Sequence, residues 1–414
     1  MLNYFKNILI IFCIITLSFF PISYADEIDN IEDKINVENT LKEVSSNTSN
    51  ILSINSRAAV VIDRNSNTVL YGKNENEIKK MASTTKIMTS IIVIENSNLS
   101  DIVTVSKKAA GTGGSRLGLK TNDKISVNNL LYGLMLCSGN DAAVCLAEYV
   151  GGNIEGFAEL MNQKANSLGL KNTHFVTPHG LDAEDHYTTA YELAILTNYA
   201  LKNETFSKIV NTKSTSIFIN NESKSISNTN ELLGVLPGVY GVKTGFTNGA
   251  NRCLVTSCKR DNLDIICVVL GADTKKFRTQ DSIKLIEYVF STFDTVDVQK
   301  IANDNFENWK NSNKILINKG IKNTLEPKLT DLPFDKIAIK KEDMENIAVK
   351  IDIEYMQNAP ITENSVVGTL SIMNGNNMIV NSKIVCNTDV PKKSILDYII
   401  YISHNYFNLI LQKK

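Results

Sequence analysis

Strand-forming sequence stands at both ends of the segment 58–290, and helix-forming sequence fills its middle. The predicted strands are short apolar runs between turn-forming residues, at 58–63, 69–71, 241–245, 252–259 and 263–270. Apolar periodicity and end signals predict helices at 86–95, 127–135, 141–149, 154–168 and 189–201, and a closing helix at 278–290. Thr189 and Glu192 predict a capping box at the start of the helix 189–201. Because a buried strand must pair with another strand, we expect the first and last strands to be neighbours. The prediction is an α/β (α+β) fold, a sheet flanked by a helical lobe.

The C-terminal third of the chain has a different pattern. Short β-rich runs recur there, at 314–317, 336–339, 347–355 and 367–373. They predict a small β-rich domain at 294–390, after a first domain at 51–293. Two roles are open for it, a spacer or a contact with a partner or glycan.

The N-terminus carries features of a secretory signal peptide. Lys6 precedes an apolar run at 8–20, and Ser23-Tyr24-Ala25 places small residues at a cleavage site, which predicts a signal peptide at 1–25. A membrane anchor is the alternative, but the run is short for one. Residues 26–50 are acidic and rich in Asn and Ser, so a flexible leader is expected.

The last segment, 391–414, is predicted to be an amphipathic helix. At about 100° per residue, Asp397, His404 and Asn408 fall on one arc, and Ile399 and Ile402 fall on the other. Polar interruptions argue against a spanning helix, so we expect a peripheral helix that lies on the membrane surface. A helix packed on the protein's own surface is the alternative.

Composition limits the classes of ligand. A net charge of −1 gives no electrostatic basis for nucleic-acid binding. Six cysteines follow the signal segment, scattered through apolar stretches of a chain that is large enough to need no disulfides. Neither they nor the four histidines show zinc-ligand spacing, so no metal and no cofactor is expected.

Three short motifs, in order along the chain, indicate serine acyl transfer. They are Ser83-Thr84-Thr85-Lys86, Ser138-Gly139-Asn140 and Lys243-Thr244-Gly245. A serine hydroxyl needs a base to become a good nucleophile, and a lysine three residues later lies one helical turn away. One such match arises easily by chance, whereas three in order do not.

The stretches around these motifs resemble one family, the D-alanyl-D-alanine carboxypeptidases, which are low-molecular-mass penicillin-binding proteins of class C type 5 (peptidase S11-like). The resemblance is carried by 82–89, 136–142, 178–181 and 242–247, and it runs from about Ser53 to Phe290. It departs at Met81, where the family usually has proline. The implied fold is the serine β-lactamase/DD-peptidase-like fold, and the implied location is the extracytoplasmic face of the bacterial membrane.

The resemblance implies a mechanism. Ser83 attacks the carbonyl between two terminal D-alanines of a peptidoglycan stem peptide, and water then frees the shortened peptide. Lys86, kept neutral by burial and by the nearby cation Lys243, is the expected base. Ser138 is expected to pass the proton to the leaving amine, and Asn140 to orient Lys86 and the peptide. β-Lactam antibiotics are the expected inhibitors.

The remaining site residues are expected to bind the substrate. Lys243 and Thr244 would face its carboxylate, and Gly245 would let an extended peptide pair with the strand edge. The resemblance implies an oxyanion hole formed by the N–H groups of Ser83 and Phe246. It also implies that Arg278, 35 positions after Lys243, binds the terminal carboxylate. The alternative is that Arg278 is a solvent-exposed arginine at the start of a helix.

His179 and His186 are expected to be structural, because this acyl-transfer scheme needs no imidazole.

Two rival functions are considered. A class A β-lactamase would need an E-x-x-L-N loop, and Glu159-Leu160-Met161-Asn162 is one residue short of it. A catalytically silent wall-binding protein would not need three intact motifs. The sequence leaves open a vegetative or sporulation role, the stem-peptide preference, other peptidase activities and the oligomeric state.

Overall fold

The computed structural model describes residues 37–46 and 52–411. The predicted signal peptide lies outside this range. The chain forms two compact units, one of residues up to Arg64 and from Val69 to Val289, the other of Asn65–Thr68 and the residues from Phe290 onward. The first unit contains all three motifs.

A five-stranded antiparallel sheet organises the first unit. Its order is β2-β1-β9-β8-β7, with β1 at Ala58–Asp63, β2 at Val69–Lys73, β7 at Val239–Thr247, β8 at Asn251–Arg260 and β9 at Leu263–Ala272. The expected pairing between the first and last strands is confirmed, since Val61 of β1 lies opposite Cys267 of β9. Every residue of β1 is buried, because both faces of the sheet are covered.

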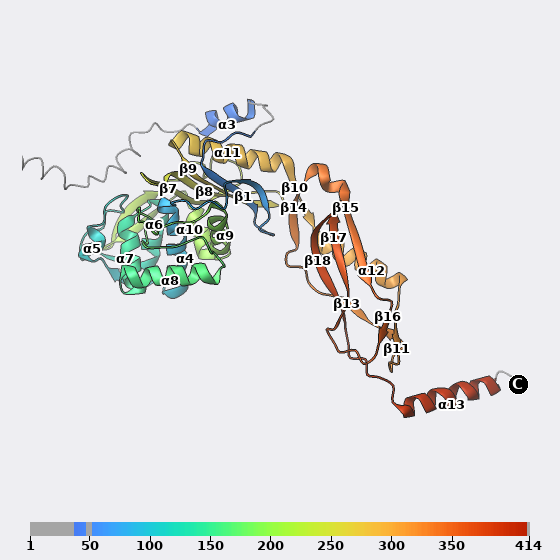
Figure 1. The fold of residues 1–414 in the computed structure, drawn as a ribbon. Coiled ribbons are helices and arrows are strands. Elements are labelled where there is room, and N and C mark those ends of the chain that lie inside the picture. Colours follow the sequence, from blue (N-terminus) through green and yellow to red (C-terminus); the bar gives the residue numbers. More distant parts are fainter. Residues whose placement is uncertain (1–36, 47–51, 412–414) are drawn as a thin grey trace, which may run out of the picture. The chain divides into compact units, whose positions relative to one another are not determined.

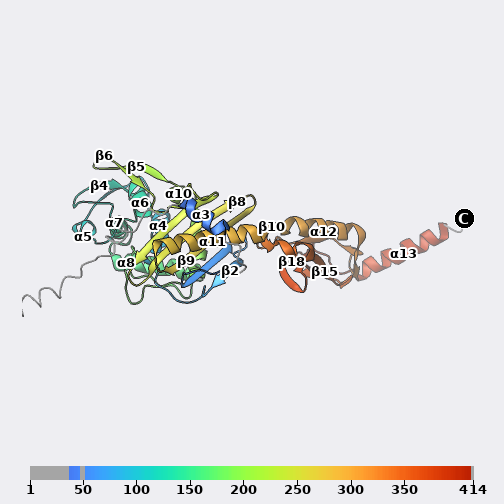
Figure 2. The ribbon, with the colours of Figure 1, turned by 90° about the horizontal axis from the view of Figure 1, so that it is seen from above.

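Helices cover both faces of this sheet (Figures 1 and 2). On one face lie the 3₁₀ helix η1 (Ala82–Thr85), α4 (Lys86–Asn96), α5 (Lys107–Ala110), α6 (Val127–Leu136), α7 (Asn140–Gly151), α8 (Ile154–Ser167), α9 (Ala190–Leu201) and α10 (Glu204–Val210). On the other face lies α11 (Lys275–Thr292). Ala58, Val60 and Ile62 pack into the core shared with the lobe, as the alternation of a strand requires. Two small antiparallel sheets complete the lobe. One pairs β3 (Ile102–Thr104) with β4 (Lys124–Ser126), and the other is a hairpin of β5 (Ser214–Ile219) and β6 (Glu222–Ser227).

The N-terminal cap of α9 is formed by Thr189, as predicted, but only half of the predicted capping box is present. Thr189 Oγ1 accepts from the N–H of Glu192 at 3.0 Å. The Glu192 carboxylate does not return to Thr189; it accepts from the N–H of Asn172 at 2.9 Å and from Thr173 Oγ1 at 2.6 Å. A tertiary contact has replaced the local one.

The second unit consists mainly of β-strands. They are β10 (Phe293–Asp297), β11 (Ile315–Asn318), β12 (Thr324–Leu325), β13 (Pro327–Leu329), β14 (Lys336–Lys340), β15 (Ile347–Ile353), β16 (Met356–Asn358), β17 (Val366–Asn374) and β18 (Asn377–Cys386). The largest sheet has the order β13-β18-β17-β15. A 3₁₀ helix, η2, spans Lys341–Asn346.

Two helices differ from expectation. α12 (Val298–Ser312) lies in the segment that was predicted to contain only β-rich runs, and it buries Val298, Ala302 and Phe306, whose spacing of four is helical. α3 (Val37–Ser46) lies in the segment predicted to be a flexible leader, and Val37 is only 5% exposed.

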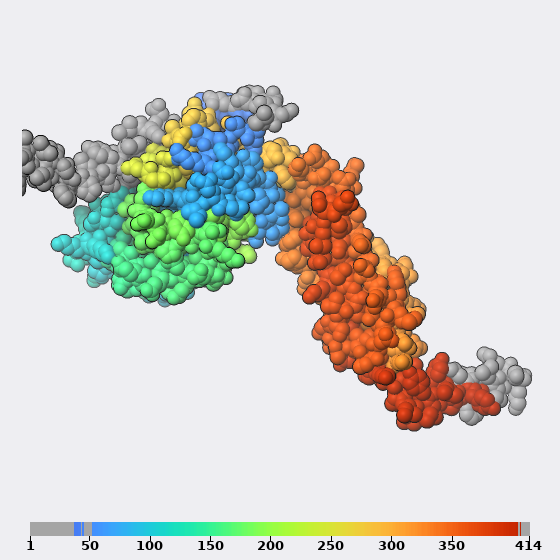
Figure 3. Space-filling model, viewed as in Figure 1, coloured from blue at the N-terminus to red at the C-terminus, as the bar shows by residue number. Residues whose placement is uncertain are grey.

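The predicted C-terminal helix is present as α13 (Ile395–Leu411). Asp397 and Ser394 cap it reciprocally, with Asp397 Oδ2 accepting from the N–H of Ser394 at 2.7 Å. The apolar side chains at 395–402 are exposed, with Ile395 82% and Ile402 65% exposed. Figure 3 shows this end of the chain in red. In the described part of the chain, no helix has the length and apolar character needed to cross a membrane.

Candidate active site

Ser83 and Lys86 lie on one tight turn. Ser83 belongs to η1, and α4 begins at Lys86, so the two residues lie one helical turn apart, as predicted, and the turn between them is of the 3₁₀ type. Residues three apart are eclipsed in a 3₁₀ helix, which brings Lys86 Nζ within 2.8 Å of Ser83 Oγ. Ser83 is partly exposed, whereas Lys86 is fully buried. The hydroxyl is therefore accessible while the amine is not.

Three oxygen atoms surround the Lys86 amine. They are Ser83 Oγ at 2.8 Å, Asn140 Oδ1 at 2.7 Å and the His179 carbonyl oxygen at 2.8 Å. The amide and carbonyl oxygens can only accept hydrogen bonds. When the Lys86 amine is neutral, the Asn140 and His179 oxygens accept hydrogen bonds from its two N–H groups. Its lone pair is then available to the Ser83 hydroxyl. This arrangement suits a base.

Asn140 is held by the loop before it. It is the first residue of α7. Its Nδ2 donates to the Gly113 carbonyl at 2.8 Å and its backbone N–H to the Ser115 carbonyl at 2.7 Å, which directs Oδ1 toward Lys86. Ser138, two residues earlier, is buried at the turn between α6 and α7 with a φ of +60°. Within the described residues, no hydrogen bond joins its hydroxyl to Ser83 or Lys86.

Asp141 fixes the same loop, a role that the sequence analysis missed. Its carboxylate accepts from the N–H groups of Leu117 at 2.8 Å, Gly118 at 2.8 Å and Leu119 at 3.0 Å. The side chain is fully buried. Backbone N–H groups carry no sequence signature, so nothing in the sequence pointed to this anchor.

The Lys243-Thr244-Gly245 motif lies on β7, the edge strand of the sheet. A Cβ on Gly245 would lie 3.1 Å from the backbone nitrogen of Ser83, so the strand runs directly beside the nucleophile turn. Thr244 Oγ1 lies 2.7 Å from Thr229 Oγ1. Lys243 is buried. Its Nζ donates to the Thr244 carbonyl at 3.1 Å. Burial raises the pKa of the Cys137 thiol, and the charges of Lys224 and Lys243 partly oppose that rise.

Phe246 and Arg278 have partners that the sequence did not predict. The guanidinium of Arg252 stacks 3.7 Å from the centre of the Phe246 ring. Arg278 is not a solvated helix-start residue: it is buried and forms an ion pair with Glu231. Burial alone would raise the pKa of the Glu231 carboxyl, but Arg278 and nearby hydrogen bonds hold that pKa below its usual value. Part of the Arg278 charge is therefore already paired.

His179 and His186 stay neutral. Burial, with Lys86 nearby, lowers the pKa of His179 to about 3, and burial lowers the pKa of His186 to about 4. His186 Nδ1 accepts from the N–H of Val176 at 3.0 Å, so Nε2 carries the proton and donates to Thr85 Oγ1 at 2.8 Å. His179 serves the site through its carbonyl oxygen and not through its imidazole.

Lowering the pH is expected to destabilise the protein through His186. Its folded pKa, about 4, lies below the unfolded value of about 6.5, so the unfolded state binds the proton more readily. Stability should be constant above pH about 6.5 and should fall as the pH drops toward 4, by up to roughly 3 kcal/mol. Urea unfolding at several pH values measures this loss. A His186→Gln variant should lose less stability over the same range, and an unchanged pH slope would contradict the assignment.

No metal site accompanies this arrangement in residues 37–46 and 52–411, where no cluster of three or more His, Cys, Asp or Glu side chains could hold an ion. All six cysteines there are unpaired. Asn162, the end of the near match to a β-lactamase loop, lies inside α8 and makes 2.8 Å hydrogen bonds to both backbone groups of Phe175.

The sequence profile described as Peptidase S11, D-alanyl-D-alanine carboxypeptidase, matches residues 43–274. The chain belongs to this family. It is a serine-type D-alanyl-D-alanine carboxypeptidase, a hydrolase. A second profile, described as penicillin-binding protein 5, C-terminal domain, matches residues 315–392, which are the all-β part of the second unit.

Individual relatives agree with this family assignment. D-alanyl-D-alanine carboxypeptidase DacF of Bacillus subtilis is 36% identical over 83% of this chain and 88% of its own length. DacA of Escherichia coli is 28% identical over 86% of this chain and 89% of its own length. The structure of penicillin-binding protein 5 from Haemophilus influenzae superposes with a TM-score of 0.70 at 29% identity, over 82% of this chain and 98% of that one. This D-alanyl-D-alanine carboxypeptidase thus shares both units with its relatives.

Proposed function

We propose that this carboxypeptidase removes the terminal D-alanine from peptidoglycan stem pentapeptides through an acyl-enzyme on Ser83. The Ser83 oxygen would bond to the carbonyl carbon between the two D-alanines while its proton passes to Lys86 Nζ. The C–N bond would then break, and the leaving nitrogen would take a proton. Water would attack the resulting ester, with its proton accepted by the same amine, and regenerate Ser83.

The observation that carries this proposal is the environment of the Lys86 amine. It lies 2.8 Å from Ser83 Oγ and is held on its other sides by Asn140 and the His179 carbonyl. A buried amine with both N–H groups occupied presents its lone pair in one direction, toward the nucleophile. Few other side-chain arrangements would make a serine reactive without an imidazole.

The remaining site residues are assigned to the substrate. Lys243 and Thr244 would meet the terminal carboxylate, and Ser138 would return the proton to the leaving amine. Gly245 leaves room for an extended peptide along β7, with the N–H groups of Ser83 and Phe246 around the developing oxyanion. Arg278 would add charge toward the carboxylate from its place beside Glu231. No cofactor takes part in this scheme.

Labelled penicillin is expected to acylate the protein at Ser83. A β-lactam resembles the D-Ala-D-Ala end, and its opened ring keeps the leaving nitrogen attached, so deacylation should be slow. Peptide mass spectrometry locates the label, and Ser83→Ala serves as the blank. A label on another residue would remove the nucleophile assignment. Released D-alanine from a peptide ending in D-Ala-D-Ala tests the reaction itself.

Location follows from the family and from α13. We propose that this protein acts on the cell wall, outside the cytoplasm, because its relatives are named D-alanyl-D-alanine carboxypeptidases. We propose further that residues 1–25 are a signal peptide and that α13 holds the protein peripherally on the outer face of the cytoplasmic membrane. The exposure of Ile399, at 58%, and of Ile402, at 65%, supports this role, because apolar side chains left in water favour a lipid interface.

Deleting residues 392–414 is expected to release the signal-cleaved protein from membranes while leaving turnover of a small D-Ala-D-Ala peptide unchanged. The double variant Ile399→Asp with Ile402→Asp should have the same effect, because it charges the apolar arc. The matched control is His404→Asp with Asn408→Asp, on the predicted polar arc, and this variant should stay bound to membranes. Fractionation of membranes followed by immunoblotting measures the distribution. A truncated protein that remains in the membrane pellet contradicts the anchor.

A further inference from the structure

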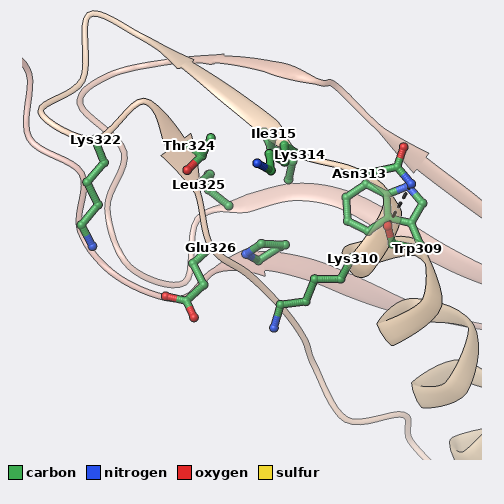
Figure 4. Close-up of a pocket in the computed structure, with 10 residues that line it drawn as sticks. Trp309, Lys310, Asn313, Lys314, Ile315, Lys322, Thr324, Leu325 and Glu326 are labelled. Atoms are coloured by element: carbon green, nitrogen blue, oxygen red, sulfur yellow. Dashed lines mark hydrogen bonds between the residues drawn. The ribbon is translucent and has the colours of Figure 1, made fainter.

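A cavity of about 340 Å³ lies in the second unit, separate from the residues assigned to catalysis. It is bounded by the end of α12 on one side and by β11, β12 and β13 on the other (Figure 4). Its volume falls within the range of about 300–1,000 Å³ that is usual for small-molecule sites. The lining residues are Trp309, Lys310, Asn313, Lys314, Ile315, Lys322, Thr324, Leu325, Glu326 and Pro327.

Trp309 gives this cavity a rigid aromatic wall. Its ring lies nearly parallel to that of buried Phe306, at 18° and with 6.0 Å between ring centres. Its Nε1 donates to the Tyr355 hydroxyl at 3.4 Å, and Asn313 Nδ2 donates to its carbonyl oxygen at 2.9 Å. Trp309 is only partly buried, so one part of the indole packs on the core while another part faces the cavity. A fixed aromatic surface binds a ligand with little loss of entropy.

The charges around Trp309 are mostly positive. Lys310, Lys314 and Lys322 line the cavity with a single carboxylate, Glu326 (Figure 4). Among the described residues, none of these four takes part in an ion pair. Lys322 Nζ makes only a long contact of 3.4 Å with Thr388 Oγ1. The ammonium groups are therefore available to an anionic ligand.

We propose that this cavity binds a muramyl sugar of the peptidoglycan glycan strand from which the stem peptide has been removed, because that removal leaves the lactyl carboxylate free. The C–H face of a sugar ring would lie against Trp309, and Asn313 and Thr324 would bind its amide and hydroxyl groups. Lys310 and Lys322 would meet its carboxylate. The choice of polymer rests on the proposed function, because an enzyme that trims stem peptides works on a wall whose glycan strands also contain muramyl sugars without a peptide. A neutral sugar would leave the lysines unused, and a simple anion would leave Trp309 unused.

Intrinsic tryptophan fluorescence reports on this cavity without a label, because Trp309 is the single tryptophan of the chain. Titration of the whole protein with the disaccharide N-acetylglucosaminyl-N-acetylmuramic acid should change tryptophan fluorescence saturably. This probe has no D-Ala-D-Ala end, so it does not engage the catalytic site. N,N′-Diacetylchitobiose, a neutral disaccharide of similar size, should bind at least about threefold more weakly, and inorganic phosphate should give no saturable change. Equal responses to all three, or no response to the muramyl disaccharide, would overturn the proposal.

The double variant Lys310→Ala with Lys322→Ala should weaken binding of the muramyl disaccharide by about fivefold, as expected for exposed charge pairs, and rising salt should weaken the wild type similarly. The matched control is Lys350→Ala with Lys383→Ala, two exposed lysines on β15 and β18 of the same unit. It should bind like the wild type. An equal loss of affinity in both variants would show that the effect comes from net charge alone, and it would refute the site.

D-alanine release from a D-Ala-D-Ala peptide should be unchanged in both double variants. This assay separates the two proposals. If the muramyl disaccharide does not bind but D-alanine is released normally, only the proposed saccharide site in the cavity is overturned. If the wild type does not release D-alanine, the proposed function is overturned.

Discussion

Lys86→Ala is expected to lower acylation by both the D-Ala-D-Ala peptide and penicillin by about 10²- to 10⁴-fold, the usual effect of losing a positioned base. The alanine leaves Ser83 Oγ without the amine that lies 2.8 Å away. Because one group takes the proton from Ser83 in both reactions, both substrates should be affected alike. Stopped-flow acylation with a chromogenic β-lactam, together with released D-alanine, measures the two rates.

Lys243→Arg is the matched comparison for this variant. It keeps a cation on β7 and alters only its shape, so it should slow acylation less than Lys86→Ala does. The folding of both variants can be checked by thermal unfolding, because Lys86 also contacts Asn140 and the His179 carbonyl. A near-normal acylation rate in a folded Lys86→Ala protein would show that another group is the base.

Gly180→Ala is expected to cost at least about 10²-fold in acylation, although residue 180 carries no reactive group. Gly180 has a φ of +86°, and a Cβ there would lie 1.9 Å from the Ala82 carbonyl oxygen and 2.7 Å from Thr85 Oγ1. The loop or the nucleophile turn must move, and a displacement of about 1 Å at a reacting group costs about that much. It would also shift the neighbouring His179 carbonyl from Lys86 Nζ.

Gly169→Ala separates steric conflict from backbone strain. Gly169 has a similar φ of +75°, but a Cβ there would meet nothing within 4 Å. Both variants therefore share the left-handed penalty of about 1–2 kcal/mol. Gly169→Ala should lose that much stability in urea unfolding and keep its acylation rate. Equal acylation rates in the two variants would mean that the Gly180 contact does not shape the site.

Much of the fold follows from local sequence pattern. The predicted helix 127–135 is α6, Val127–Leu136, and the predicted strand 263–270 is β9, Leu263–Ala272, because apolar periodicity reports directly on which face is buried. α12 was missed although Val298, Ala302 and Phe306 recur at helical spacing, because β-rich runs on its C-terminal side dominated the interpretation of that region. Glu192 was assigned to a local cap and is instead bound to Asn172, a choice that only packing could make.

The sequence by itself determined the reaction class, because its three ordered motifs supply the serine and the two lysines that are typical of serine acyl transfer. The spacing of Ser83 and Lys86 brings these two residues together on any helical turn. Only the tertiary structure decided how Lys86 is oriented. Its amine is held by Asn140, 54 residues away, and by the carbonyl of His179, 93 residues away. Such contacts depend on how the helices and loops pack, and a backbone carbonyl has no residue type to reveal it. The same holds for the Glu231 carboxylate beside Arg278, whose position depends on the meeting of a loop and α11.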